Sequence, residues 1–219
     1  MDRHVRIAVA DYGAGNLRSV EHALTAVGAE VSVIRDGESL RDVDGLVVPG
    51  VGASQPAMDR LHRRGLVEPI RSWVQSGRPY LGICLGMQLA FEGSDEDGAV
   101  TLGLLRGRTE ALENPPTLPH IGWNQVDQTE PHPLFKGVPD GADFYFVHSF
   151  AGRPLDKTAV IATTEHGAPF VSAIASGPVI GVQFHPERSG ADGLPVLSNW
   201  LGIVRAAAST PAEPAEALA

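Results

Sequence analysis

The alternation of short apolar runs with helical patterns over roughly the first 90 residues is the feature that most constrains the fold. The predicted strands are Val5–Ala10, Val31–Ile34, Gly45–Val48 and Pro79–Ile83. Apolar residues three and four apart in Leu17–Val27 predict a helix that Asn16 can cap and Gly28 can end, and Leu66–Val74 predicts another. Strands separated by helices favour an α/β fold with a mostly parallel sheet, which binds ligands at the carboxyl ends of its strands.

From about Val100 the pattern changes to short apolar runs separated by Gly, Pro, Asn and Asp. The predicted strands here are Asp143–Phe150, Val160–Thr164, Phe170–Ala175 and Val179–Phe184. The last two are joined by the turn residues 176–178, so this half is predicted to be largely antiparallel. A helix over Leu194–Val204 closes a single domain of residues 1–205, and the Ala-, Pro- and Glu-rich residues 206–219 are predicted to be a disordered tail.

Composition excludes several classes of partner. The net charge is −9 and no basic run exceeds two residues, which argues against nucleic acids and anionic membrane surfaces. No segment is apolar for long enough to cross a membrane. Residues 11–18 begin like a dinucleotide-binding fingerprint, but Arg18 stands where the third glycine belongs, so we expect no such cofactor. The single cysteine suits a reducing compartment, and we expect a cytoplasmic protein.

That cysteine lies in Gly82-Ile83-Cys84-Leu85-Gly86, where a strand gives way to a helical pattern. A G-x-C-x-G sequence at such a junction is typical of a nucleophile elbow, because the sharp turn leaves no room for neighbouring side chains. A buried cysteine that serves only as a small apolar residue is the alternative.

His185 can supply the base that a thiol nucleophile needs. It ends an apolar strand, and in extended backbone Glu187 would point the same way and orient the imidazole. Pro186 favours that extended backbone. The segment 48–52, Val-Pro-Gly-Val-Gly, leaves a neighbouring strand and can turn backbone N–H groups toward an oxyanion, although it also reads as an ordinary glycine-rich turn.

These motifs resemble those of the class I glutamine amidotransferases: Cys84 lies in "GICLGMQ", and His185 and Glu187 lie in "GVQFHPE". Within that family, "DYGAGNLRS", "VVPGVG", "LPHIGWN" and "FVHSF" resemble the glutaminase subunits of imidazole glycerol phosphate synthases. The resemblance covers roughly residues 5–205 and implies a flavodoxin-like fold.

The resemblance also implies roles. Cys84 would attack the side-chain amide of glutamine, His185 would carry the proton to the leaving ammonia, and Glu187 would orient His185. The residues implied to stabilise the oxyanion are Gly50, Val51, Gly52 and Leu85, and those implied to hold glutamine are Gln88, His148 and Ser149. Ammonia would pass to a barrel-shaped cyclase subunit in a heterodimer. The residues implied to face that partner are Asn16, Trp123, Asn124 and Arg188. No cofactor or metal is implied.

Three positions depart from the family pattern: Arg188 where lysine is frequent, and His166 and Phe150 where tyrosine is more usual. None belongs to the expected triad. Other functions stay open, namely a glutaminase for another biosynthetic pathway, a cysteine hydrolase of the dienelactone type, and a regulatory partner without activity. The filled triad argues against the last of these.

Overall fold

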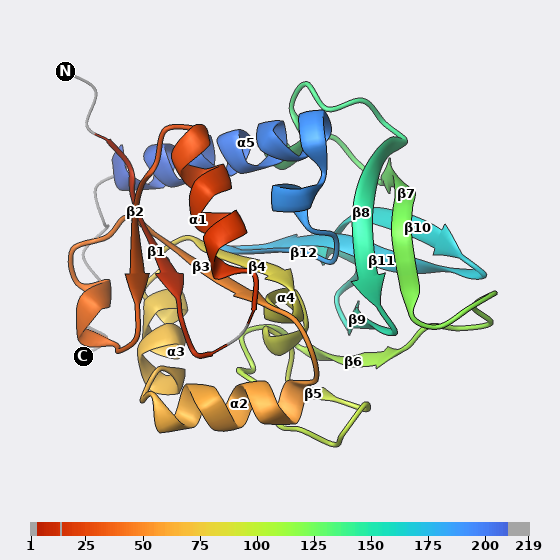
Figure 1. Cartoon of the computed structure of the whole chain (residues 1–219), viewed down its shortest axis with the longest axis horizontal. Helices are drawn as coiled ribbons and strands as arrows, with labels where there is room; N and C mark the ends of the chain where they lie inside the picture. The colour runs from red at the N-terminus through yellow and green to blue at the C-terminus, as the bar shows by residue number, and fades with distance from the viewer. Residues whose placement is uncertain (1–3, 14, 210–219) are drawn as a thin grey trace, which may run out of the picture.

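The computed structural model describes residues 4–13 and 15–209, and it confirms the predicted α/β class. One mixed sheet of nine strands forms the centre of the molecule (Figure 1). In spatial order its strands are β2 (Glu30–Ile34), β1 (Arg6–Ala10), β3 (Gly45–Gly50), β4 (Tyr80–Cys84), β12 (Val179–Val182), β11 (Ala168–Ser176), β10 (Val160–His166), β7 (His120–Gln128) and β8 (Ala142–His148). The first five run parallel to their neighbours, and from β12 to β8 each pairing is antiparallel.

Helices cover both faces of the parallel half, as parallel strands require. The helices α1 (Leu17–Ala26) and α5 (Gly190–Ser209) pack on one face, and α2 (Ser54–Arg63), α3 (Val67–Gln75) and α4 (Leu85–Leu89) pack on the other. Alternate residues of β1 feed the two cores: Ile7 and Val9 join the α1/α5 core, and Ala8 and Ala10 join the other. None of the described helices is long and apolar enough to cross a lipid bilayer.

A three-stranded sheet lies beside the main one, in the order β5 (Gly93–Ser94), β6 (Gly107–Ala111) and β9 (Phe150–Pro154). The predicted strand Asp143–Phe150 is therefore two strands, because the chain leaves the large sheet at Ser149 and enters the small one. Short 3₁₀ turns complete the fold at Glu38–Leu40, Pro133–Phe135, Lys157–Ala159 and Pro186–Arg188.

Several local predictions change in the structure. Asn16 precedes α1 in a left-handed conformation (φ 72°) and its side chain makes no cap hydrogen bond, so the predicted side-chain cap was wrong. Gly28 does end the helix, with a φ of 93°. Helix α2 and strands β6 and β7 were not predicted. Helix α5 begins at Gly190 and continues to Ser209, so residues 206–209 of the predicted tail are helical. Residues 210–219 lie outside the described part of the chain.

Register along the parallel strands brings three chain segments to one edge of the sheet. Gly50 of β3 pairs with Cys84 of β4, and Val182 of β12 pairs with Ile83. The residues that follow these strands therefore emerge side by side at their carboxyl ends, where the sequence predicted a ligand site.

Candidate active site

Cys84 lies at the sharp turn where β4 ends and α4 begins. Its φ of 52° and ψ of −109° are strained for any residue with a side chain. The two flanking glycines are required, since a Cβ on Gly82 would lie 2.5 Å from the carbonyl oxygen of Gly86, and one on Gly86 would lie 1.7 Å from that of Val48. The local geometry is that of a nucleophile elbow. As the sequence predicted, the turn leaves no room for side chains at the two flanking positions.

His185 and Glu187 form a buried pair just after β12. His185 Nδ1 lies 2.8 Å from Glu187 Oε1, and the two side chains are only 2% and 0% exposed. They meet across the 3₁₀ turn Pro186–Arg188, so the extended backbone predicted for this segment was wrong. A proline suits the first position of a helical turn, because its fixed φ fits and its missing N–H is not needed there.

The charge of this pair is set by its neighbours. Burial lowers the pKa of His185, but Cys84 and Glu187 together outweigh that effect and raise the pKa to about 10. His185 Nε2 is buried and has no hydrogen-bond partner among the residues that the structure describes, so Cys84 acts on it through charge attraction rather than through a formed bond. The imidazole is therefore protonated at neutral pH and carries its Nε2–H beside the sulfur of Cys84.

Asn16 connects the start of the chain to this pair. Its Nδ2 donates a hydrogen bond to Glu187 Oε1, across 171 positions in the sequence. That oxygen therefore accepts from both Asn16 and His185, whereas Glu187 Oε2 has no hydrogen-bond partner among the described residues. Asn16 was predicted to face a partner subunit, and the structure gives its side chain a contact within the chain.

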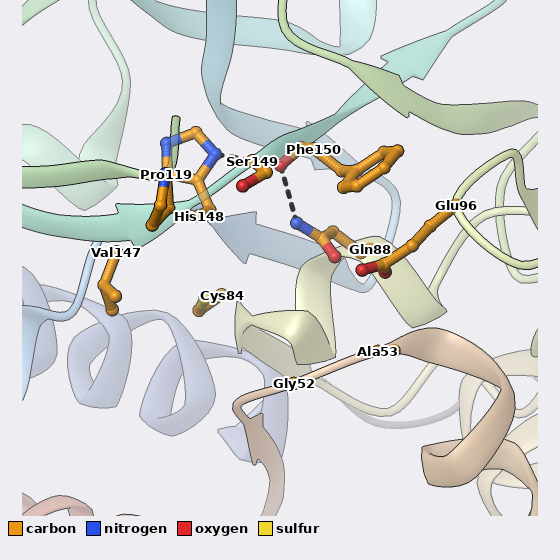
Figure 2. A pocket seen from close by; sticks show the side chains of 10 residues that line it. All are labelled: Gly52, Ala53, Cys84, Gln88, Glu96, Pro119, Val147, His148, Ser149 and Phe150. Carbon is orange, nitrogen blue, oxygen red and sulfur yellow. Dashed lines mark hydrogen bonds between the residues drawn. The ribbon is translucent and has the colours of Figure 1, made fainter. Parts of the chain in front are cut away.

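A pocket of about 220 Å³ opens at Cys84 (Figure 2). The residues that line it are Gly52, Ala53, Cys84, Gln88, Glu96, Pro119, Val147, His148, Ser149 and Phe150. They come from the segment after β3, the end of β4, α4, the loop after β5, the residue before β7, and the point where β8 passes into β9. The three residues expected to hold a substrate, Gln88, His148 and Ser149, are among them.

The amide of Gln88 is already oriented by the protein. Its Nε2 donates to the carbonyl of Phe150 at 2.8 Å and to Gln183 Oε1 at 3.0 Å. Its Oε1 is therefore the atom left for a ligand, and Figure 2 shows that oxygen turned away from Phe150. Glu96 also lines the pocket, and burial together with Asp97 raises its pKa. Glu96 was not predicted as a site residue, because it lies in "GSDEDG", an acidic stretch typical of a surface loop.

His148 belongs to a chain of hydrogen bonds that fixes its tautomer. Its Nδ1 donates to the carbonyl of Phe150 at 2.8 Å, so its Nε2 must accept from His120 Nδ1 at 3.2 Å. His120 Nε2 in turn accepts from Asn124 Nδ2, which also donates to the carbonyl of Glu165. Burial lowers the pKa of His148 to about 3, and burial with His166 lowers that of His120 to about 4. Both are neutral at pH 7.

The residues expected to stabilise an oxyanion surround Cys84 from β3 and α4. Gly50 is packed tightly, since an added Cβ would lie 2.2 Å from Tyr12 Oη and 3.1 Å from Leu85 Cβ. Tyr12 Oη donates to the carbonyl of Pro49 at 2.8 Å. Val51 and Gly52 are exposed, and Gly52 has a φ of 100°. The segment is thus anchored up to Gly50 and solvent-accessible beyond it.

Trp123 and Arg188, two of the residues expected to face a partner, lie on the same surface. The guanidinium of Arg188 lies 5.1 Å from the ring centre of Tyr145, which packs edge-on against Trp123. Trp123 is 57% exposed. Asn124, in contrast, bonds inward to His120. Of the remaining departures from the family pattern, His166 stacks on His120 at 4.0 Å, and Phe150 contributes its carbonyl oxygen to the pocket network.

Comparison with known proteins decides the family. The family model described as glutamine amidotransferase class-I matches residues 8–201. The chain belongs to the class I glutamine amidotransferase family.

No cluster of three or more His, Cys, Asp or Glu side chains that could hold a metal ion occurs in the part of the chain that the structure describes.

Two similar sequences agree with this family, and a similar solved structure agrees with the fold. The imidazole glycerol phosphate synthase subunit HisH of Synechococcus sp. (strain JA-3-3Ab) is 46% identical over 204 residues, which are 91% of this chain and 94% of that protein. The protein of the same name from Moorella thermoacetica is 47% identical over 200 residues, 91% of this chain and 95% of that one. The solved structure of PurLQS from Thermotoga maritima is 21% identical, with a TM-score of 0.74 over 92% of this chain and 100% of its own, and it supports the fold.

Proposed function

We propose that this amidotransferase is the glutaminase subunit of an imidazole glycerol phosphate synthase, with Cys84 as its nucleophile. The observation that carries the proposal is the strained Cys84 elbow beside the buried His185–Glu187 pair, at the floor of a pocket. The identity of 46–47% to synthase subunits over nine-tenths of the chain supports the choice among glutamine-dependent pathways.

In the first half of the reaction, the Cys84 thiolate attacks the side-chain carbonyl carbon of glutamine and the carbonyl oxygen becomes an oxyanion. His185 then gives the proton on Nε2 to the amide nitrogen, the C–N bond breaks, and ammonia leaves with a γ-glutamyl thioester on Cys84. The raised pKa of His185 fits this role, because the proton is in place before the substrate arrives. Glu187 stabilises the imidazolium and fixes its orientation.

In the second half, water attacks the thioester. His185 Nε2 accepts a proton from that water, the C–S bond breaks, and glutamate leaves while the Cys84 thiolate is restored. Backbone N–H groups around Val51, Gly52 and Leu85 are the proposed donors to the oxyanion in both halves. The two halves together return Cys84 and His185 to their starting states, so the steps balance with glutamine and water alone.

The pocket walls match the polar ends of glutamine. Glu96 is the one acidic residue in the described lining, and a carboxylate binds an α-ammonium group. Gln88 Oε1 is free to accept a hydrogen bond from the ligand, because both contacts of its Nε2 are inside the protein. Ser149 lies between His148 and Phe150 along the pocket lining (Figure 2). These groups bind the ends of the substrate while Cys84 reacts with its side chain.

An exposed apolar strip beside the pocket is the proposed surface for the cyclase subunit. Ile121 and Trp123 alternate along β7 and are 60% and 57% exposed. They pair with Val147 and Tyr145 of β8, the edge strand of the large sheet, and Val147 also lines the pocket. A partner that covers this strip would close the pocket from bulk water, so that ammonia passes to the partner.

Coupling between the subunits is proposed to act on Val51 and Gly52. The chain is anchored at Pro49 by Tyr12, whereas the exposed residues beyond it can be turned by a contact with the partner. A segment that completes the oxyanion site only in the complex would prevent waste of glutamine.

The test is glutamate release from glutamine by the purified chain, alone and with a cyclase subunit and its nucleotide ligand, with Cys84→Ala as the control. Release that rises strongly in the complex and vanishes in the variant supports the proposal. Full activity of the chain alone would refute the proposed gating by the partner. Activity in Cys84→Ala would refute the assignment of Cys84 as the nucleophile.

A further inference from the structure

Gln183 is a buried amide beside the sulfur of Cys84, and the triad does not account for it. It follows β12, its backbone N–H donates to the carbonyl of Ser172 at 2.8 Å, and the residue has no exposed surface. Its Nε2 lies 3.5 Å from Cys84 Sγ, and its Oε1 lies 3.0 Å from Gln88 Nε2. A buried amide is destabilising unless its polar atoms find partners, so these contacts fix the side chain.

The orientation of the amide follows from the network. The carbonyl oxygen of Phe150 can only accept, so the Gln88 atom that contacts it must be the nitrogen, as Figure 2 shows. The same nitrogen faces Gln183, whose atom at that contact must therefore be the oxygen. The nitrogen of Gln183 is then turned toward Cys84. A backbone carbonyl thus determines, through two side chains, that Cys84 meets a donor rather than an acceptor.

We propose that Gln183 is a positioning residue that donates a hydrogen bond to the sulfur of Cys84, favours the thiolate and aims it at the substrate carbonyl. The inference rests on the proposed role of Cys84 as the nucleophile. Cys84 is only 4% exposed, so a thiolate there has little hydration, and an N–H group supplies what water would. A donor stabilises the charged sulfur more than the neutral thiol, and a neutral amide does so without opposing the charge of His185.

The composition of the chain makes the test direct. Cys84 is the only cysteine, so alkylation by iodoacetamide reports on its thiolate alone and needs no glutamine turnover. The alkylation rate is measured against pH in the wild type, in Gln183→Met and in Gln183→Glu. The methionine side chain has the length of glutamine but no hydrogen-bond donor. The glutamate side chain has the shape of glutamine, but its ionised carboxylate only accepts hydrogen bonds. The control is Gln75→Glu, which makes the same change of charge at an exposed residue of α3.

We expect the pH midpoint of alkylation to rise by about one unit in Gln183→Met, and by more in Gln183→Glu, because a hydrogen bond to a charged group is lost or reversed. The pH midpoint of alkylation should not rise in Gln75→Glu. We also expect kcat for glutamine hydrolysis to fall by about tenfold or more in both Gln183 variants. Should Gln183→Met not fold, Gln183→Glu has the closer shape and carries the test.

Unchanged midpoints in folded Gln183 variants would overturn the proposal and leave Gln183 as a filler of space. The alkylation test can succeed or fail independently of the test of the proposed function. If the wild type does not hydrolyse glutamine but the midpoint shifts, the glutaminase assignment falls and the contact between Gln183 and Cys84 stands.

Discussion

Alanine in place of Gly86 tests how strictly the elbow depends on close backbone approach. The new Cβ would lie 1.7 Å from the carbonyl oxygen of Val48, in the adjacent strand β3. It would have to retreat by about 1.3 Å before it reached 3.0 Å, below which such contacts essentially do not occur. The carbonyl oxygen of Val48 belongs to the backbone of a buried strand and cannot easily yield, so α4 and Cys84 must move instead. We expect a loss of unfolding free energy of about 3 kcal/mol or more.

The expected loss of activity is larger than that of stability. A shift of about 1 Å in a reacting group can lower the rate by about a hundredfold. Gly202 provides the matched control, because it also lies in a helix, but no atom of the described residues is within 4 Å of the Cβ that alanine would add. Gly202→Ala should stabilise the protein by about 0.5–1 kcal/mol through helix propensity. Urea unfolding and glutamine hydrolysis are the measurements. A Gly86→Ala protein with wild-type stability and kcat would refute the reasoning.

Three further substitutions have defined outcomes. Glu187→Gln should lower the pKa of His185 from about 10, seen by NMR titration, and lower kcat, because the imidazolium loses its carboxylate. The raised pKa of His185 should stabilise the wild type fully below about pH 6.5, with that contribution lost as the pH rises through 10; because Cys84 still acts on His185, urea unfolding of Glu187→Gln should show a smaller pH dependence, and an unaltered profile would argue against the pair. Glu96→Gln should raise the KM for glutamine by about tenfold with little change in kcat, and a change in kcat alone would exclude Glu96 from binding the ammonium. Trp123→Ala should weaken binding of the cyclase subunit by about tenfold or more in calorimetry while Cys84 alkylation stays unchanged, and unchanged affinity would place the interface elsewhere.

Features that depend only on residues close together in the chain could be predicted from the sequence. The glycines around Cys84 predicted the elbow because the limit is space within a few residues, and the two-residue spacing brought His185 and Glu187 together. The backbone between them was nevertheless wrong, since Pro186 starts a 3₁₀ turn as readily as it continues an extended segment. The role of Cys84, His185 and Glu187 in catalysis stays a prediction that the experiments above test.

Elements whose pattern depends on distant residues escaped prediction. Strand β7 carries buried His120 and exposed Ile121 and Trp123, the reverse of the usual alternation, because its inner face holds a histidine network. Helix α2 buries Ser54, Ala57, Met58 and Leu61 at helical spacing, but only two of these side chains are large and apolar, so its apolar signal in the sequence is weak. The contacts of Gln183 with Cys84 and Gln88 join residues 99 and 95 positions apart, which no local pattern encodes.

The most direct test of the central claim is detection of the γ-glutamyl group on Cys84. The complex with the cyclase subunit is mixed with glutamine, quenched in acid and digested, and the peptide that contains Cys84 is analysed by mass spectrometry. The account predicts a γ-glutamyl adduct on that peptide, absent without glutamine and absent in Cys84→Ala, which should also release no glutamate. Glutamine hydrolysis at the normal rate by Cys84→Ala would contradict it.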